Sequence, residues 1–368
     1  MKINNINIGG GVNKQQTLLL KKEKEYSILV MLGTTILLVA FAALVIVVDP
    51  FVQYHKPLDR LQTVFSRGTQ SYVNPGLAKN YSYNNVIIGS SVSENFYASD
   101  FDAAFGGTAL KLPFAGGTTM TYRNMLDTVF AQGKVDTVFY SLDFFALTMD
   151  ATKPRYDMPM YLYDQNLFND VAYVLNKDVL GYIATVVQAN CSGTTVSLND
   201  SYNWEHEYEF SQARVLQQYA RSKDIAEKKA ATKAYYPAVE AGLENVLYHI
   251  KEHPETKFKI FYPPYSILWY DNYKRAGTLE ATIAGMARSM DILLEYENVE
   301  LYFFAGWEDV ITDLNNYRES MHFSEKINKR MVDALAKQEN RITRENLQST
   351  MEAFYAFVNT FDCGVYYP

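Results

Sequence analysis

The stretch Asn85-Val86-Ile87-Ile88-Gly89-Ser90-Ser91 decides the fold. A short apolar run with β-branched residues that stops at a glycine is typical of a buried strand. Further runs of this kind follow along the chain, separated by stretches with helical spacing: residues 109–112, 137–142, 258–262 and 299–304. Strands that alternate with helices predict an α/β fold, with a doubly wound parallel sheet of about five strands.

A long insertion separates the third of these strands from the fourth. Residues 147–255 exceed one crossover connection and predict an inserted subdomain, with helices at 210–221 and 238–251 and an ordered loop at 157–164. Insertions of this length often cover a site. The alternative is a helical embellishment without a role in recognition. Elsewhere we expect helices at 119–132, at 325–337 with Ser324 as the cap, and at 344–358.

An apolar segment lies near the N-terminus. Residues 27–48 carry no charge over 22 positions, which is enough to cross a bilayer as a helix. The lysines at 21, 22 and 24 precede it, so the positive-inside bias predicts a cytoplasmic N-terminus and an extracytoplasmic body. A cleaved signal peptide is the alternative, but its only cleavage candidate, Ala40-Phe41-Ala42, lies inside the apolar run.

These features divide the chain. We expect a cytoplasmic segment at 1–26, a transmembrane helix at 27–48 and a stalk at 49–83. The α/β domain follows at 84–340, with its insertion at 147–255, and a C-terminal helix and tail occupy 341–368.

Charge and cysteine content exclude some functions. Beyond residue 49 the chain holds 29 Lys and Arg against 38 Asp and Glu, a net charge of −9 that disfavours a nucleic-acid partner. The two cysteines, Cys191 and Cys363, are compatible with one disulfide or with two free thiols. No CxxC or HExxH spacing indicates a metal site, and we predict neither a metal nor a cofactor.

Two short stretches carry candidate chemistry. Gly89-Ser90-Ser91 follows the first strand, at the carboxyl edge where open parallel sheets bind their ligands. Near the C-terminus, Glu319 precedes His322 by three residues, so its carboxylate can orient the imidazole while the other ring nitrogen faces a serine. A plain helix cap at Ser91 and a surface histidine at 322 are the structural alternatives.

Joined, these stretches resemble the SGNH hydrolase superfamily, whose fold is flavodoxin-like. Gly89-Ser90-Ser91 resembles the first sequence block and implies Ser91 as the nucleophile, while Glu319 and His322 match the acid and base of the last block. Residues 112–118 occupy the place of the second block, which implies oxyanion donors at Gly116 and Gly117 beside the amide of Ser91. The likeness covers residues 84–146 and 256–336.

Within that superfamily the chain is most similar to membrane-anchored extracytoplasmic proteins of bacterial surface-polymer acylation. These include the D-alanine transfer protein of teichoic-acid operons and the partners of membrane-bound O-acyltransferases. The resemblance implies a serine esterase or O-acyltransferase of the bacterial cell envelope, acting on a cell-surface glycopolymer or acyl donor. A non-catalytic accessory protein that docks a membrane acyltransferase or binds a surface polymer is the second hypothesis.

One residue departs from the superfamily pattern. Asp143 stands where the third block has an asparagine that donates to the oxyanion, and an ionised carboxylate can only accept hydrogen bonds. A structural role for Asp143 would pair it with Arg123 or Arg155. A role in substrate binding would place it against a cationic acyl group such as an aminoacyl ester.

Overall fold

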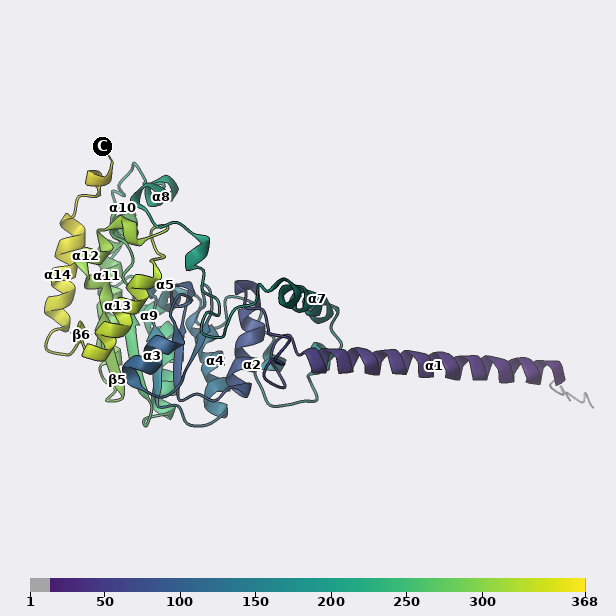
Figure 1. Ribbon diagram of the computed structural model, residues 1–368. Coiled ribbons are helices and arrows are strands. Elements are labelled where there is room, and N and C mark those ends of the chain that lie inside the picture. The colour runs from purple at the N-terminus through teal and green to yellow at the C-terminus, as the bar shows by residue number, and fades with distance from the viewer. Residues whose placement is uncertain (1–13, 368) are drawn as a thin grey trace, which may run out of the picture.

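The computed structural model describes residues 14–367 and has an α/β fold built on one six-stranded sheet (Figure 1). The strands are β1 (Asn85–Gly89), β2 (Ala109–Pro113), β3 (Thr137–Ser141), β4 (Lys257–Tyr262), β5 (Val299–Phe303) and β6 (Arg341–Ile342). Their order is β2-β1-β3-β4-β5-β6, and β1 to β5 are parallel. The predicted doubly wound sheet is confirmed, with one addition: β6 pairs antiparallel with β5.

Helices cover both faces of the sheet. The helices of the chain are α1 (Lys14–Val48), α2 (Gln70–Asn80), α3 (Ala98–Phe105), α4 (Thr119–Ala131), α5 (Phe144–Thr148), α6 (Val171–Val174), α7 (Lys177–Ser192), α8 (Gln212–Gln218), α9 (Tyr236–Glu252), α10 (Ile267–Arg275), α11 (Leu279–Leu293), α12 (Glu308–Ile311), α13 (Glu325–Lys337) and α14 (Leu347–Thr360). On one side α9 packs between α4 and α11, and α14 lies outside α11. Helix α3 packs against α13.

The strand order reverses beside Ser91 and Asp143. The chain runs from β1 to β2 in one direction and then crosses to β3 on the other side of β1. In sheets of this kind ligands bind where the order reverses, outside the carboxyl ends of the two strands at the reversal, here β1 and β3. Ser91 follows β1 and Asp143 follows β3, so both flank this switch point.

Helix α1 projects from the body as a long rod (Figure 1). It is apolar and long enough to span a membrane, and only 6% of its most apolar window is buried. The described part begins at Lys14, so the first half of the predicted N-terminal segment lies outside the described residues.

Two predicted segments differ from their expected form. Helix α2 lies inside the predicted stalk, and its Val73 and Leu77 are fully buried, because the helix packs on α4 and β2. Helix α9, at the end of the predicted insertion, is the crossover between β3 and β4 and belongs to the layer over the sheet. The two cysteines are free thiols: Cys191 is exposed and Cys363 is buried.

Candidate functional site

The turn after β1 presents Ser91. A Cβ atom on Gly89 would lie 2.4 Å from the Ser93 hydroxyl and 2.7 Å from Cβ of Ser141, so this position has no room for a side chain. The close approach brings the ends of β1 and β3 together. Ser91 then begins a short 3-10 helix, Ser91–Ser93, directly beyond the end of the strand.

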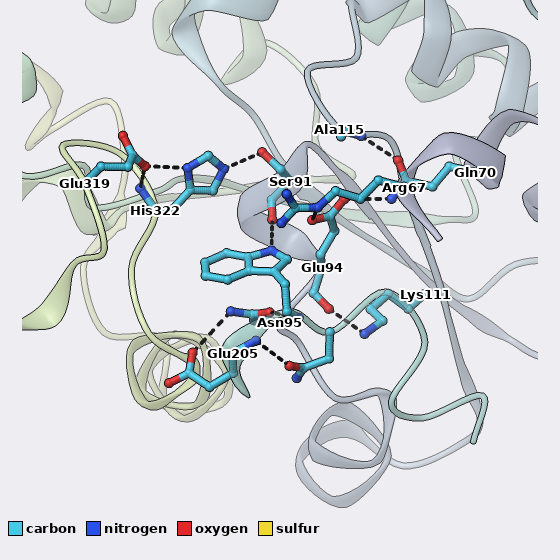
Figure 2. Close-up of polar contacts among 12 residues, drawn as sticks. Arg67, Gln70, Ser91, Glu94, Asn95, Lys111, Ala115, Glu205, Glu319 and His322 are labelled. Atoms are coloured by element: carbon cyan, nitrogen blue, oxygen red, sulfur yellow. Dashed lines mark hydrogen bonds and ion pairs between the residues drawn. The ribbon is translucent and has the colours of Figure 1, made fainter. Parts of the chain in front are cut away.

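Ser91, His322 and Glu319 form one hydrogen-bonded row (Figure 2). Ser91 Oγ lies 2.7 Å from His322 Nε2, and His322 Nδ1 lies 2.5 Å from Glu319 Oε1. The structure therefore joins residues that are 231 positions apart in the sequence. A histidine held between a serine and a carboxylate can take the hydroxyl proton of the serine.

Glu319 also shapes the loop that carries the histidine. Its Oε1 accepts the backbone N–H of His322 at 2.7 Å, and its Oε2 accepts that of Met321 at 3.2 Å. Burial favours a raised pKa for Glu319, but the hydrogen bonds and the charge of His322 outweigh it and hold the pKa of this carboxyl below its usual range. Glu319 is thus an ionised acceptor at neutral pH, which fixes the tautomer of the imidazole.

His322 is nearly buried, and its environment favours the neutral form. Burial lowers the pKa of His322, the bond to Glu319 opposes this shift, and the nearby charges of Arg318 and Arg67 add to it. A neutral imidazole at pH 7 is the form that a general base needs.

The two predicted glycine donors differ. The Gly117 amide donates to the Phe114 carbonyl at 2.9 Å and is therefore engaged in a turn. Within residues 14–367, the amides of Ser91 and Gly116 donate to no protein atom. Gly116 has a φ of +63°, which favours glycine, and Arg155 lies 3.4 Å from the position that its Cβ would take. Of the two glycines, only Gly116 keeps its amide free of a hydrogen bond within the described residues.

Asp143 is fully buried at the start of α5. Its Oδ1 accepts a hydrogen bond from the Tyr265 hydroxyl, and its Oδ2 has no partner among the described residues. Burial raises the pKa of Asp143 to about 6, against the opposing effects of Tyr265 and, more weakly, of the neighbouring Ser90 hydroxyl. Neither of the arginines expected as partners pairs with it, since Arg123 donates to Asn245 and Arg155 contacts Met149.

Trp204, from the insertion, lies in no motif of the sequence but contacts the site. Its indole Nε1 donates to the Ser91 carbonyl at 3.2 Å, and its ring meets that of His322 edge-on at 5.4 Å. The guanidinium of Arg318 lies 4.4 Å from the centre of the indole, and that of Arg67 lies 5.5 Å from it. The insertion thus contacts the serine and the histidine directly. The rarity of tryptophan, three in the chain, was the only signal in the sequence.

A second set of contacts supports the loop after β2. Buried Glu94 pairs with Arg67 at 2.8 Å and accepts from Gln70 Nε2 at 2.7 Å (Figure 2). Gln70 Oε1 accepts the amide of Ala115 at 2.8 Å, which fixes the residue before Gly116. Burial raises the pKa of Glu94 to about 7, although Arg67 opposes the shift. Helix α2 therefore positions the loop that carries Ala115 and Gly116.

The predicted cap of α13 has a different form. Ser324 occupies the N-cap position, but its hydroxyl accepts no capping bond. Instead, Glu205 from the insertion accepts the amide of Glu325 at 2.9 Å, and it also accepts from Asn95 at 3.3 Å. A carboxylate at a helix N-terminus is stabilising, so this contact ties the insertion to both halves of the site.

No protein-family model matches the chain, and no curated protein matches it. The class that the fold defines is an α/β protein with a mostly parallel six-stranded sheet and an N-terminal apolar helix. Within residues 14–367, no group of three or more His, Cys, Asp or Glu side chains could hold a metal ion.

Proposed function

We propose that the protein is a membrane-anchored, extracytoplasmic serine esterase or O-acyltransferase of the SGNH type, acting on acyl groups of a cell-surface glycopolymer. The observation that carries the proposal is the row from Ser91 Oγ to His322 Nε2 at 2.7 Å and from His322 Nδ1 to Glu319 at 2.5 Å. The strand order supports it as well, since the serine follows the first strand at the switch point.

The geometry supports a two-step acyl transfer. Ser91 Oγ attacks the acyl carbonyl carbon while its proton moves to His322 Nε2, and the amides of Ser91 and Gly116 stabilise the oxyanion. The ester C–O bond then breaks, and the leaving oxygen takes the proton from His322. Water or an acceptor hydroxyl next gives its proton to His322 and attacks the acyl-serine, which releases Ser91 with its proton restored.

Labelling with a fluorophosphonate tests the nucleophile. We expect the full chain in detergent micelles to react at Ser91 and the Ser91→Ala variant to lose the label. Ser93→Ala is a matched control, because Ser93 lies in the same short helix and makes no hydrogen bond to His322. Retention of the label in Ser91→Ala would refute the assignment of the nucleophile.

The second candidate is a non-catalytic accessory protein, and Asp143 favours it. A buried acid at the position of the third block cannot donate to an oxyanion while it is ionised. This candidate predicts that the wild-type chain stays unlabelled by the fluorophosphonate yet binds the polymer or a membrane acyltransferase. The labelling experiment therefore separates the two functions.

The proposed orientation has its own test. Arg60 is exposed shortly after α1, so a cysteine there, in a Cys191→Ser background, reports the side of the membrane on which the body lies. We expect an impermeant thiol reagent to label Arg60→Cys on intact cells. Labelling only after lysis would contradict an extracytoplasmic body.

A further inference from the structure

The surface beside the end of α1 is apolar. Leu167 and Phe168 precede α6 and expose 72% and 95% of their surface, and Val171 exposes 58%. Large apolar side chains are rarely exposed together on the surface of a soluble protein, so this cluster indicates contact with an apolar partner. We name this surface the α6 apex, defined as residues 167–175.

The α6 apex and α1 line one groove of about 600 Å³. From α1 it is lined by Thr35, Leu38, Val39, Ala42 and Ile46, from the apex by Leu167, Phe168, Asp170, Val171, Val174 and Leu175, and from the segment after α1 by Tyr54. The α1 positions share one helix face. Leu38 lies ten residues before Val48, about 15 Å along the helix axis, so the groove runs well into the apolar segment.

The apex is held rigidly against α1. At the end of α1, buried Asp49 accepts hydrogen bonds from the Tyr173 hydroxyl at 2.9 Å and from the amides of Gln53, Tyr54 and His55 at 2.9, 2.7 and 3.1 Å. Because Tyr173 belongs to α6, this cluster fixes the apex relative to the apolar helix. If the C-terminal part of α1 lies in lipid, the α6 apex must therefore lie at the same depth.

The turn before α6 is stabilised by hydrogen bonds among its own polar groups, while its apolar side chains are exposed. Asp164 accepts the amide of Asn166 at 2.9 Å and the side-chain amide of Asn169 at 2.7 Å, and Asn166 accepts the amide of Phe168 at 3.1 Å. These polar groups thus pair with one another, while Oδ1 of Asn169 is buried without a partner among the described residues. Internal pairing of this kind is what a segment needs where no water can satisfy it.

From these observations we propose that the α6 apex inserts into the lipid bilayer beside α1 and forms a second membrane contact of the protein. The occupant of the groove is lipid acyl chain. The reason is continuity: hydrocarbon that surrounds α1 between Thr35 and Ile46 also covers the apex on the opposite wall of the groove. The inference rests on the membrane anchor in the proposed function and does not depend on the catalytic activity.

Depth-dependent quenching tests the inference. The full chain, in a Cys191→Ser background that keeps buried Cys363, is labelled with an environment-sensitive fluorophore at one new cysteine and incorporated into phosphatidylcholine vesicles. The sites are Phe168→Cys in the apex, Val39→Cys in α1 and Glu352→Cys on α14, which lies at the opposite end of the body from α1 (Figure 1). Phe168 is almost fully exposed, so its replacement leaves the core intact.

We expect spin-labelled acyl chains to quench the fluorophore at Phe168→Cys about as strongly as at Val39→Cys and to leave Glu352→Cys unaffected. Aqueous iodide should show the reverse order. If Val39→Cys is quenched by the lipid while Phe168→Cys is quenched only by iodide, the inference is overturned and the anchor stands. If Val39→Cys is itself quenched only by iodide, the anchor fails together with the inference.

Discussion

Asp143 gives a prediction whose magnitude follows from its burial. The carboxyl is fully buried, and burial raises its pKa from an ordinary value of 3.8 to about 6. At about 1.4 kcal/mol for each pKa unit, ionised Asp143 costs the folded state about 3 kcal/mol. Between these two pKa values the folded chain binds more protons than the unfolded chain, so this group lowers the free energy of unfolding as the pH rises from about 4 to about 6.

Asp143→Asn should remove that cost. The asparagine keeps an oxygen that can accept from Tyr265, and it carries no charge. We expect the variant at pH 8 to have a free energy of unfolding up to about 3 kcal/mol above that of the wild type, with the difference vanishing near pH 4. Urea unfolding of the full chain in micelles, followed by tryptophan fluorescence, measures it, and exposed Asp178→Asn is the matched control. An Asp143→Asn variant that is equally or less stable at pH 8 would refute the reasoning.

Three further predictions concern the site. Ser91→Ala and His322→Ala should each lower kcat for a model ester by roughly 10⁴-fold or more, and the double variant should be little worse, because the residues act as one unit; additive losses would contradict this. The acid limb of the profile of kcat/KM against pH should have its midpoint below 6.5, since the pKa of His322 is lowered. Arg318→Gln removes a positive charge near His322 and should move this midpoint to higher pH. The surface variant Arg330→Gln is the control and should leave the midpoint unchanged. Trp204→Phe removes a neutral hydrogen bond to Ser91 worth about 1 kcal/mol and should lower kcat about fivefold with KM unchanged; wild-type kcat in this variant would contradict a positioning role.

The strands could be predicted from the sequence because strands buried on both faces form apolar runs. Residues 85–88 and 258–262 form apolar runs, and the structure extends each by one residue, to Asn85–Gly89 and Lys257–Tyr262. Strand β6, Arg341–Ile342, escaped prediction because two residues at a sheet edge carry no apolar pattern. Helix α8 is shorter than the predicted 210–221, since its periodicity continues into residues that are not helical.

The site was only partly predictable. Ser91, Glu319 and His322 could be found because each lies in a short stretch with a recognisable spacing. The contacts of Trp204 and Gln70 could not, because each depends on a long-range approach of segments that no local pattern encodes. The predicted arginine partner of Asp143 was wrong for the same reason, since Tyr265 comes from the distant loop after β4.

The buried hydrogen bonds of Asp49 fix the orientation of the α/β body relative to α1. When a flexible linker joins a membrane helix to a folded domain, the domain can occupy many positions above the bilayer. The length of the linker then sets the largest distance that the domain can reach from the membrane. Here the helix ends among four hydrogen-bond donors, one of them from α6, so the body is held at one height and one tilt relative to α1. With α1 in a bilayer, Ser91 would stay at one distance from the membrane surface, and the acyl group that we propose as its substrate would have to be delivered to that distance.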